Sequence, residues 1–350
     1  MKTRRKLYFA ITVGTLAFLL VSPRTIRSED GDRDRPEKTP PKTLYIWAGD
    51  QARLAPDFLA VINFDEDSQD YGKVITTVAV PPPGNVGNEP HHCHLSAGKN
   101  ILACGGLLSL LRGQNTFSFL MCPMHATPDF FPPQTVLSRA SLTTSAVQSG
   151  GFLVTQMGSH AGGAPGRVAE FDEHLRMVAE WPVHPPHHGF NPHGISARPE
   201  LNLMVTSDFM TPSSTLDTFP GNPELRGSIR VWDFHKREVV NTIQIPNALG
   251  TMDVKLIPGD PLGRAFTAGR FDGLVYLVNT RNGTSQVVFD CEDIVPHIEV
   301  PVRGGMVQQL AMPRSEDRLL FASFQAGQVG MLDVSNPRNI LSKQELSTWD

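Results

Sequence analysis

The stretch Gly227-Ser-Ile-Arg-Val-Trp-Asp233 decides the fold that we expect for this chain of 350 residues. Apolar side chains alternate along the stretch, and an aspartate ends it. This pattern is typical of a β-strand that runs into a tight turn. A second apolar run, Val239 to Ile245, follows directly. The stretch therefore predicts a β-hairpin.

The same pattern recurs along the chain. Neighbouring later copies end 46 to 61 residues apart, whereas the first two end 109 residues apart. One further hairpin is therefore expected between residues 64 and 171, near Gln114 to Pro128. The recognisable copies, the first of which lacks the leading glycine, are Asp57-Phe-Leu-Ala-Val-Ile-Asn63, Gly166-Arg-Val-Ala-Glu-Phe-Asp172, Gly273-Leu-Val-Tyr-Leu-Val-Asn279 and Gly327-Gln-Val-Gly-Met-Leu-Asp333.

A second unit recurs between the hairpins and consists of a short segment followed by a buried strand. Added to a hairpin, it gives about four strands per unit, which is the content of one propeller blade. We therefore predict an all-β chain, a β-propeller of which about six blades are represented. Copies of this second unit are Pro90 to Cys104, Pro192 to Thr206, Thr251 to Thr267 and Met306 to Ala322.

The composition agrees with short strands and many turns. Glycine (30) and proline (29) are frequent, only 19% of residues are charged, and no long stretch has the spacing of an amphipathic helix. The net charge of -4 and the lack of a basic patch interleaved with aromatics leave no surface suited to phosphates. Nucleic acid is therefore not an expected partner.

The N-terminus predicts export. Basic residues Lys2 to Lys6 precede the apolar run Leu7 to Val21, which has the layout of a signal peptide and is short for a membrane span. We assign residues 1–28 to a signal peptide or uncleaved anchor, residues 29–42 to a charged, proline-rich spacer, and residues 43–350 to the propeller. The layout therefore predicts export from the cytoplasm.

Aligning the second units brings several ligand-type side chains to the central channel of the propeller. His91 or His92, His193 and Asp253 fall at matching positions and are expected to face one axis. Neighbouring residues of a regular strand point to opposite faces, so using both His91 and His92 requires a bulge. Such imidazoles suit Cu, Zn, Fe or Ni. The alternative is that they cap loops or hydrogen-bond within the channel.

Cys93 offers two interpretations. It is either a soft ligand or thiol that meets a substrate, or an inert packing residue, which is the more frequent role of a buried cysteine. Cys104 lies in an apolar strand and is expected in the core. The four cysteines allow one disulfide bridge but require none. Histidines 184, 187 and 188 lie in a proline-rich loop and are expected in solvent.

Four motifs together resemble the selenium-binding protein/methanethiol oxidase family over most of residues 43 to 345. They are Trp47-Ala48-Gly49-Asp50, Gly84-Asn85-Val86-Gly87-Asn88-Glu89-Pro90-His91-His92-Cys93-His94, Phe190-Asn191-Pro192-His193-Gly194-Ile195 and Gly250-Thr251-Met252-Asp253-Val254-Lys255.

The resemblance implies a seven-bladed propeller, often periplasmic in bacteria. It also implies a copper enzyme that oxidises methanethiol with O2 to formaldehyde, hydrogen sulfide and hydrogen peroxide. The histidine pair of the family falls on His91 and His92, while His193 is added as a ligand from its Asn-Pro-His-Gly motif and the strand alignment. Cys93 and Asp253 are candidate contacts of a small thiol substrate. The alternative function is a non-catalytic propeller that binds thiol, metal or selenium or acts as an interaction scaffold.

Three departures from the family accompany the resemblance. Gly72 stands where animal members have a selenium-binding cysteine, so selenium binding is not expected there. Members of the family continue for a further blade with another histidine motif, so we expect an open propeller with exposed strand edges. Residues 115 to 149 do not look like the family, and we hypothesise a local frame error that resequencing would test.

Overall fold

The computed structural model describes most of the chain from residue 42 onward. The predicted signal peptide or anchor (1–28) and the spacer up to residue 41 lie outside it, as does much of the segment with the hypothesised frame error. No helix in the described part is long and apolar enough to cross a membrane. The described residues are 42–82, 86–87, 90–106, 117–122, 129–130, 141–146, 151–159, 162–186, 189–215, 224–290, 307–312, 319–324, 328–337 and 341–347.

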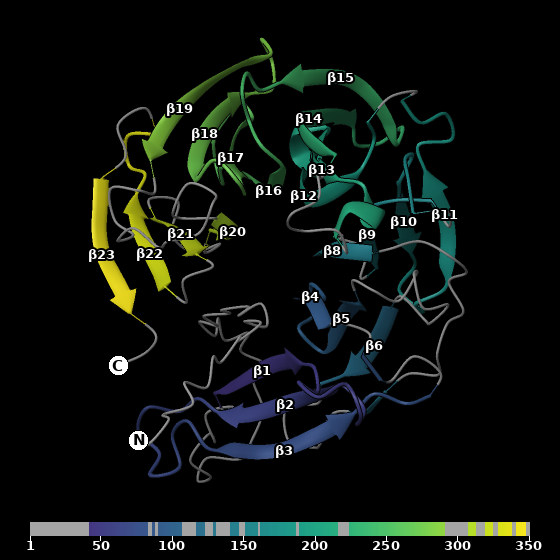
Figure 1. The fold of residues 1–350 in the computed structure, drawn as a ribbon, viewed down its shortest axis with the longest axis vertical. Helices are drawn as coiled ribbons and strands as arrows, with labels where there is room; N and C mark the ends of the chain where they lie inside the picture. Colours follow the sequence, from purple (N-terminus) through teal and green to yellow (C-terminus); the bar gives the residue numbers. More distant parts are fainter. Residues whose placement is uncertain are drawn as a thin grey trace, which may run out of the picture.

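The described strands form six antiparallel sheets around a common centre (Figure 1). The first three sheets contain β1 (Thr43–Ala48), β2 (Phe58–Asn63) and β3 (Val74–Ala79); β4 (Pro90–Leu95), β5 (Ile101–Gly106), β6 (Phe117–Met121) and β7 (Asp129–Phe130); and β8 (Ser141–Ala146), β9 (Phe152–Gln156), β10 (Arg167–Phe171) and β11 (Met177–Trp181).

The other three sheets continue the ring. They contain β12 (Pro192–Arg198), β13 (Leu203–Met210), β14 (Leu225–Asp233) and β15 (Glu238–Gln244); β16 (Thr251–Leu256), β17 (Arg264–Gly269), β18 (Leu274–Asn279) and β19 (Thr284–Asp290); and β20 (Val307–Ala311), β21 (Leu319–Phe324), β22 (Gln328–Asp333) and β23 (Leu341–Ser347). Two short 3-10 helices, Pro199–Leu201 and Pro212–Thr215, flank β13.

The predicted repeat is confirmed. Each recognised copy of the motif forms one strand, which pairs with the strand that follows it in the chain. In the four-stranded sheets it is the third strand from the centre, and in the three-stranded first sheet it is the second. The hairpin expected near Gln114 to Pro128 exists as β6 and β7, and β7 has only two residues. The sequence alignment missed the inner pair of the third sheet, β8 and β9.

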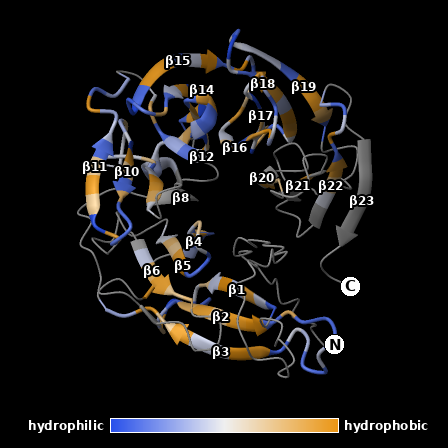
Figure 2. Ribbon diagram, turned by 180° about the vertical axis from the view of Figure 1, so that it is seen from behind, coloured by the Kyte–Doolittle hydropathy of each residue, from blue (hydrophilic) through white to orange (hydrophobic). Residues whose placement is uncertain are grey.

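The hydrophobic cores lie between neighbouring sheets. One cluster joins β13–β15 to β16–β18 and contains Val205, Ile229 and Val278, all fully buried. The fully buried Trp232 belongs to another cluster, between the third and fourth sheets, and its indole N–H donates to Thr206 Oγ1 at 3.0 Å. Strand β2, whose sequence is almost entirely apolar, shows this character clearly in Figure 2. The second to fifth sheets are thus covered on both faces, and the innermost strands line the centre.

Candidate metal centre

A bulge in β4 sets the first part of the site. His91 pairs with Gly105 and Cys93 pairs with Cys104, so His92 is an extra residue between two consecutive partners on β5. Because the bulge interrupts the alternation of side chains, two neighbouring histidines reach the same side of the strand. The sequence-based expectation of a bulge at this position is confirmed.

His193 comes from β12, two sheets further around the ring. The register of β12 shifts between Pro192 and Ile195, and the Gly194 N–H donates to Ser207 Oγ at 2.9 Å. A Cβ atom on Gly194 would lie 2.7 Å from Asp253 Cα, so only glycine allows β12 to approach β16 this closely. The close approach fixes the backbone beside His193.

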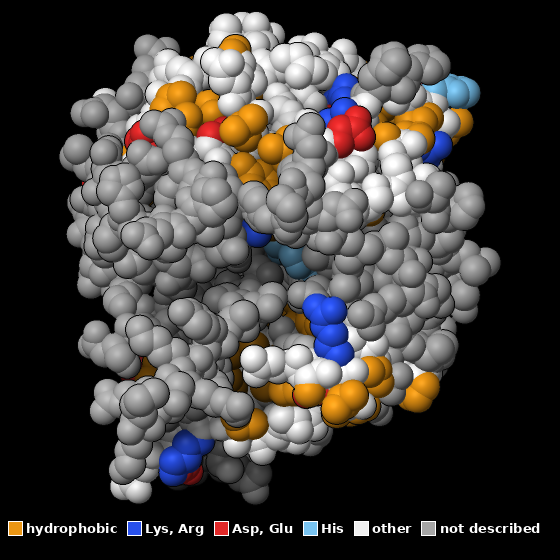
Figure 3. Space-filling view, viewed as in Figure 1, with side chains coloured by type: hydrophobic (Ala, Val, Ile, Leu, Met, Phe, Trp, Pro, Cys, Tyr) orange, Lys and Arg blue, Asp and Glu red, His pale blue; other side chains and the backbone are white. Residues whose placement is uncertain are grey.

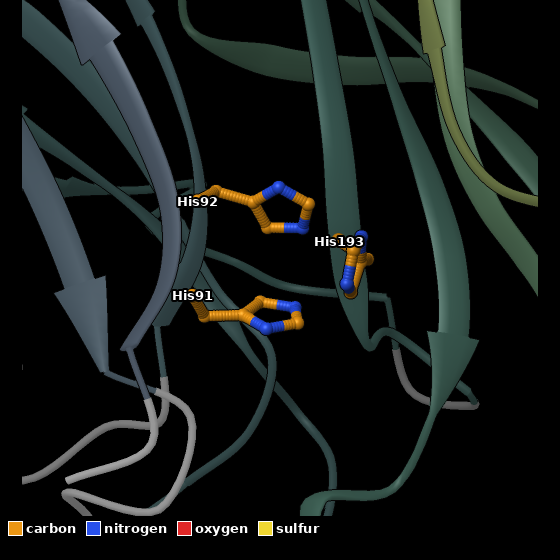
Figure 4. A group of neighbouring side chains, drawn as sticks. All are labelled: His91, His92 and His193. Atoms are coloured by element: carbon orange, nitrogen blue, oxygen red, sulfur yellow. The ribbon is translucent and has the colours of Figure 1, made fainter. Parts of the chain in front are cut away.

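The three imidazoles form one group (Figure 4). Ring centroids are 4.2 Å apart for His91 and His92, 5.0 Å for His92 and His193, and 5.7 Å for His91 and His193. One ligand nitrogen from each ring lies within 4.8 Å of the others. This confirms that the three histidines converge, as the strand alignment predicts.

The ring nitrogens of this group lack partners. Both nitrogens of His92 and His193, and Nε2 of His91, are buried without a hydrogen bond. Buried polar atoms are nearly always hydrogen-bonded, and leaving one unpaired is costly. By geometry, none of these five nitrogens makes the channel hydrogen bond that the alternative role requires, although the Met252 backbone lies close enough to His193 to oppose the lowering of its pKa. The donor set fits a metal that accepts nitrogen ligands.

The electrostatics of the group keep the imidazoles neutral. Burial lowers the pKa of His91 to about 3, with a smaller effect from the positive charge of Arg270. Burial and then mutual repulsion lower the pKa of His92 well below its ordinary value. The pKa of His193 is also lowered, mainly by burial. Neutral imidazoles with free lone pairs are the form that binds metals.

These pKa values predict that the metal-free protein loses stability in acid. An unfolded histidine binds a proton near pH 6.5, whereas the folded ones resist protonation down to much lower pH. The contribution is therefore present above about pH 6.5 and is lost as the pH falls toward about 3, with a slope of up to about 1.4 kcal/mol per pH unit for each histidine. Urea unfolding across this range measures the slope, and a His193→Leu variant should show a shallower one. Equal slopes would contradict the assignment.

The wall beside His193 is apolar and rich in sulfur. Phe209 contacts the His193 ring with centroids 5.0 Å apart and stacks on Phe271 at 6.1 Å. Met252 joins this cluster, and Arg270 Nη1 lies 3.4 Å from its Sδ. Figure 3 shows histidine and Lys/Arg atoms at the floor of a central hollow on this face. Sequence reasoning missed this wall, because the strand alignment placed Asp253, the neighbour of Met252, on the axis.

Comparisons with known proteins agree with the resemblance seen in the sequence motifs. No protein-family profile matches the chain. Methanethiol oxidase from Rattus norvegicus is 21% identical over 314 residues, and selenium-binding protein 2 from Mus musculus is 24% identical over 312 residues. Each alignment covers 81% of this chain and 64% of the relative. The predicted family resemblance is confirmed.

The fold comparison adds a solved structure. A hypothetical selenium-binding protein from Sulfolobus tokodaii superposes with a TM-score of 0.72 and 16% identity, covering 89% of this chain and 75% of that one. The outer coat vertex of COPII superposes with a TM-score of 0.60 and 11% identity. At such identities these likenesses show a shared propeller fold alone.

Cys93 is not a free thiol in this structure. Its sulfur forms a disulfide with Cys104, the partner that faces it on β5. The bonded sulfurs pack against the core between the first two sheets, where Cys104 is 1% exposed. A disulfide sulfur is neither a thiolate nor a nucleophile, so the structure does not hold Cys93 as a free thiol ligand, and substrate contact by Cys93 stays a prediction. The signal for this disulfide in the sequence was that two cysteines fall on the two strands of one hairpin.

Asp253 lies apart from the imidazole group. Its Oδ1 accepts hydrogen bonds from the Val254 N–H at 2.8 Å and from Lys255 Nζ at 2.9 Å, and its Oδ2 accepts one from the Leu310 N–H at 3.0 Å. The carboxylate thus links β16 to β20, the innermost strand of the next sheet. This network occupies the oxygens that were expected to meet substrate, and substrate contact by Asp253 stays a prediction.

The remaining histidines of the proline-rich loop give a partial answer. His184 is exposed, which confirms the expectation for that residue. Residues 187 and 188 lie outside the described residues.

Gly72, which the resemblance places where animal members have a selenium-binding cysteine, has a φ of 79° in an exposed turn, a conformation that glycine adopts without strain.

Proposed function

We propose that this chain is a copper-dependent methanethiol oxidase-like protein that is exported to the periplasm. It would convert methanethiol, O2 and water into formaldehyde, hydrogen sulfide and hydrogen peroxide. One observation carries the proposal: three imidazoles with buried, unpartnered nitrogens converge in a chain similar to methanethiol oxidases. The chain spans about 64% of the length of those relatives.

His91, His92 and His193 would hold the copper ion. Imidazole nitrogen suits both oxidation states of copper, and the three rings need no proton loss to act as ligands. When bound, copper supplies one-electron redox chemistry with O2 and a soft site for a sulfur ligand.

The surrounding residues prepare the hollow for a small thiol. Phe209 and Met252, both buried, form an apolar wall that favours a methylated sulfur compound over water. The positive charge of Arg270 acts on His91 and His193, and the same field favours a thiolate over a thiol near these rings. These residues thus exclude water and stabilise the reactive anion.

Metal analysis followed by product assay tests the proposal. Purified protein should contain copper bound in proportion to protein and should release both hydrogen peroxide and hydrogen sulfide from methanethiol in the presence of O2. The matched control is the same protein stripped of metal with a chelator, which should regain both products when copper is returned. Protein that contains no copper after expression with copper supplied would refute the proposal.

Export is tested separately. The motivation is the basic and apolar layout of residues 1–28. Expression of the full chain should place the protein in the periplasmic fraction, whereas a variant with Lys or Asp substitutions in the apolar run should stay in the cytoplasm. Equal cytoplasmic retention of both would contradict export.

A non-catalytic metal-binding propeller is the second candidate. The observation that favours it is the lack of a carboxylate in the imidazole group among the described residues, since Asp253 lies outside the group and is held by Lys255 and by backbone N–H groups. Such a protein would bind copper and release neither peroxide nor sulfide from methanethiol. The same assay therefore separates the two functions.

A further inference from the structure

Register shifts like that of β4 recur on other innermost strands, and side-chain hydroxyls hold them. In β12 the shift between Pro192 and Ile195 is held by Ser207 Oγ, which accepts from the Gly194 N–H. In β16 the shift between Thr251 and Asp253 is held by Thr267 Oγ1, which donates to the Asp253 carbonyl at 2.6 Å. The second strand of these blades thus supplies the group that fixes the bulge.

The β4 bulge lacks such a hydroxyl, because no residue of β5 (Ile101–Gly106) carries one, and Ala103 stands where β17 has Thr267. Its partners on β5 are Gly105, which has no side chain, and Cys104. Instead of a hydroxyl, the Cys93–Cys104 disulfide connects the two strands, and Cys93 directly follows His92 in the chain. A covalent bond therefore spans the two strands next to the bulged residue.

The disulfide and the imidazoles lie on opposite sides of β4. The sulfurs pack with Trp47 and Leu59 in the core between the first two sheets, whereas His91 and His92 point toward His193. The Trp47 indole N–H also donates to the Gly105 carbonyl at 3.0 Å, which anchors β5 on the same side. The sulfurs are thus placed to hold the strand without touching a metal.

We propose that the Cys93–Cys104 disulfide is a positioning element of the metal centre, which holds the β4 bulge so that His91 and His92 both face His193. This inference rests on the metal-binding part of the proposed function. Groups that orient metal ligands typically change metal affinity by about 10-fold to 100-fold when they are removed. Opening the disulfide is expected to weaken metal binding to that extent, because the bulge relaxes and one histidine leaves the group.

Zn2+ titration by calorimetry tests the inference, since Zn2+ accepts imidazole nitrogen and has no redox chemistry. The test variant is Cys93→Ala/Cys104→Ala, and the matched control is Cys122→Ala, which removes a buried free cysteine from the same core cluster. The disulfide variant should bind Zn2+ at least about 10-fold more weakly than the parent, and the control should bind like the parent. Thermal unfolding of both variants shows whether the titration temperature lies within the folded range.

A second measurement covers the case in which the double variant does not fold. The parent is reduced with a phosphine, the reductant is removed under nitrogen, and Zn2+ affinity is measured before and after reoxidation in air. Affinity should fall on reduction and return on reoxidation, with mass spectrometry confirming the state of both cysteines.

The outcomes separate the two ideas. If the disulfide variant or reduced parent is less stable but binds Zn2+ as tightly as the parent, the disulfide is only a stabilising link and the inference is wrong. If the parent itself binds Zn2+ no better than His91→Ala/His92→Ala, the metal centre fails, and the inference fails with it.

Discussion

The variant His91→Ala/His92→Ala is expected to lose specific copper binding, with an affinity more than about 100-fold weaker than that of the parent. This exceeds the loss for residues that only orient ligands, because two of the three ligands are removed. His193 alone leaves one nitrogen ligand in a buried site, and no carboxylate of the described chain joins the group to replace the others. Copper content of the purified proteins and competitive titration with a chromophoric chelator measure the loss.

A surface histidine provides the matched control. The His174 side chain is 67% exposed and lies outside the imidazole group, so His174→Ala should keep the copper content and affinity of the parent. Folding of the double variant is verified by circular dichroism, since it removes unpartnered buried nitrogens and is expected to leave the β-sheets intact. Retention of parent-like copper affinity by the double variant would contradict the assignment of the site.

The variant Arg230→Leu is expected to lower the free energy of unfolding by about 3–5 kcal/mol. Arg230 pairs with Asp208 at 2.5 Å, with side chains that are 7% and 0% exposed. Burial raises the pKa of the Asp208 carboxyl, and the guanidinium opposes this effect by stabilising the charge. Removing Arg230 leaves a carboxylate in the core without its cation. Chemical denaturation of both proteins near neutral pH measures the difference.

This ion pair also supports the metal centre. Asp208 Oδ1 accepts a hydrogen bond from the Asn191 N–H at 3.0 Å, just before Pro192 and His193, and the Asp208 carbonyl accepts one from Thr251 Oγ1.

The matched control for Arg230→Leu is Arg176→Leu, which breaks a pair with Asp172 in which the arginine is 68% exposed. Exposed pairs contribute between about 0 and 1 kcal/mol. Similar decreases in the free energy of unfolding for both variants would show that the buried pair stabilises the fold no more than an exposed pair.

The sequence predicted the fold closely because the blade is a local structure. A strand such as Gly227 to Asp233 and its hairpin partner lie next to each other in the chain, so alternation and a turn residue suffice to identify them. The third sheet shows the limit. Its inner pair, β8 and β9, follows a stretch without a recognisable motif, and only pairing with β10 reveals it.

The candidate site was predicted in part for the same reason. The strand alignment brought His193 and one of His91 and His92 to the axis, because equivalent strands repeat in register, and the family resemblance indicated the histidine pair. Asp253 occupies an equivalent strand as well, yet its carboxylate turns to Lys255 and to the backbone of β20. Strand position predicts which residues approach the axis, whereas the direction of a side chain depends on the partners that it meets.

The sequence by itself determined the order of hairpins, the ring of sheets and the three histidines that approach its axis, because all of these follow from repeated local patterns. Only the tertiary structure decided that the imidazole nitrogens lack partners, that Phe209 and Met252 form the wall beside them, and that Cys93 is bonded to Cys104. These features depend on the packing of one blade against the next and on the register of β4 against β5. Packing and register depend on many side chains at once, so no single stretch of sequence carries them.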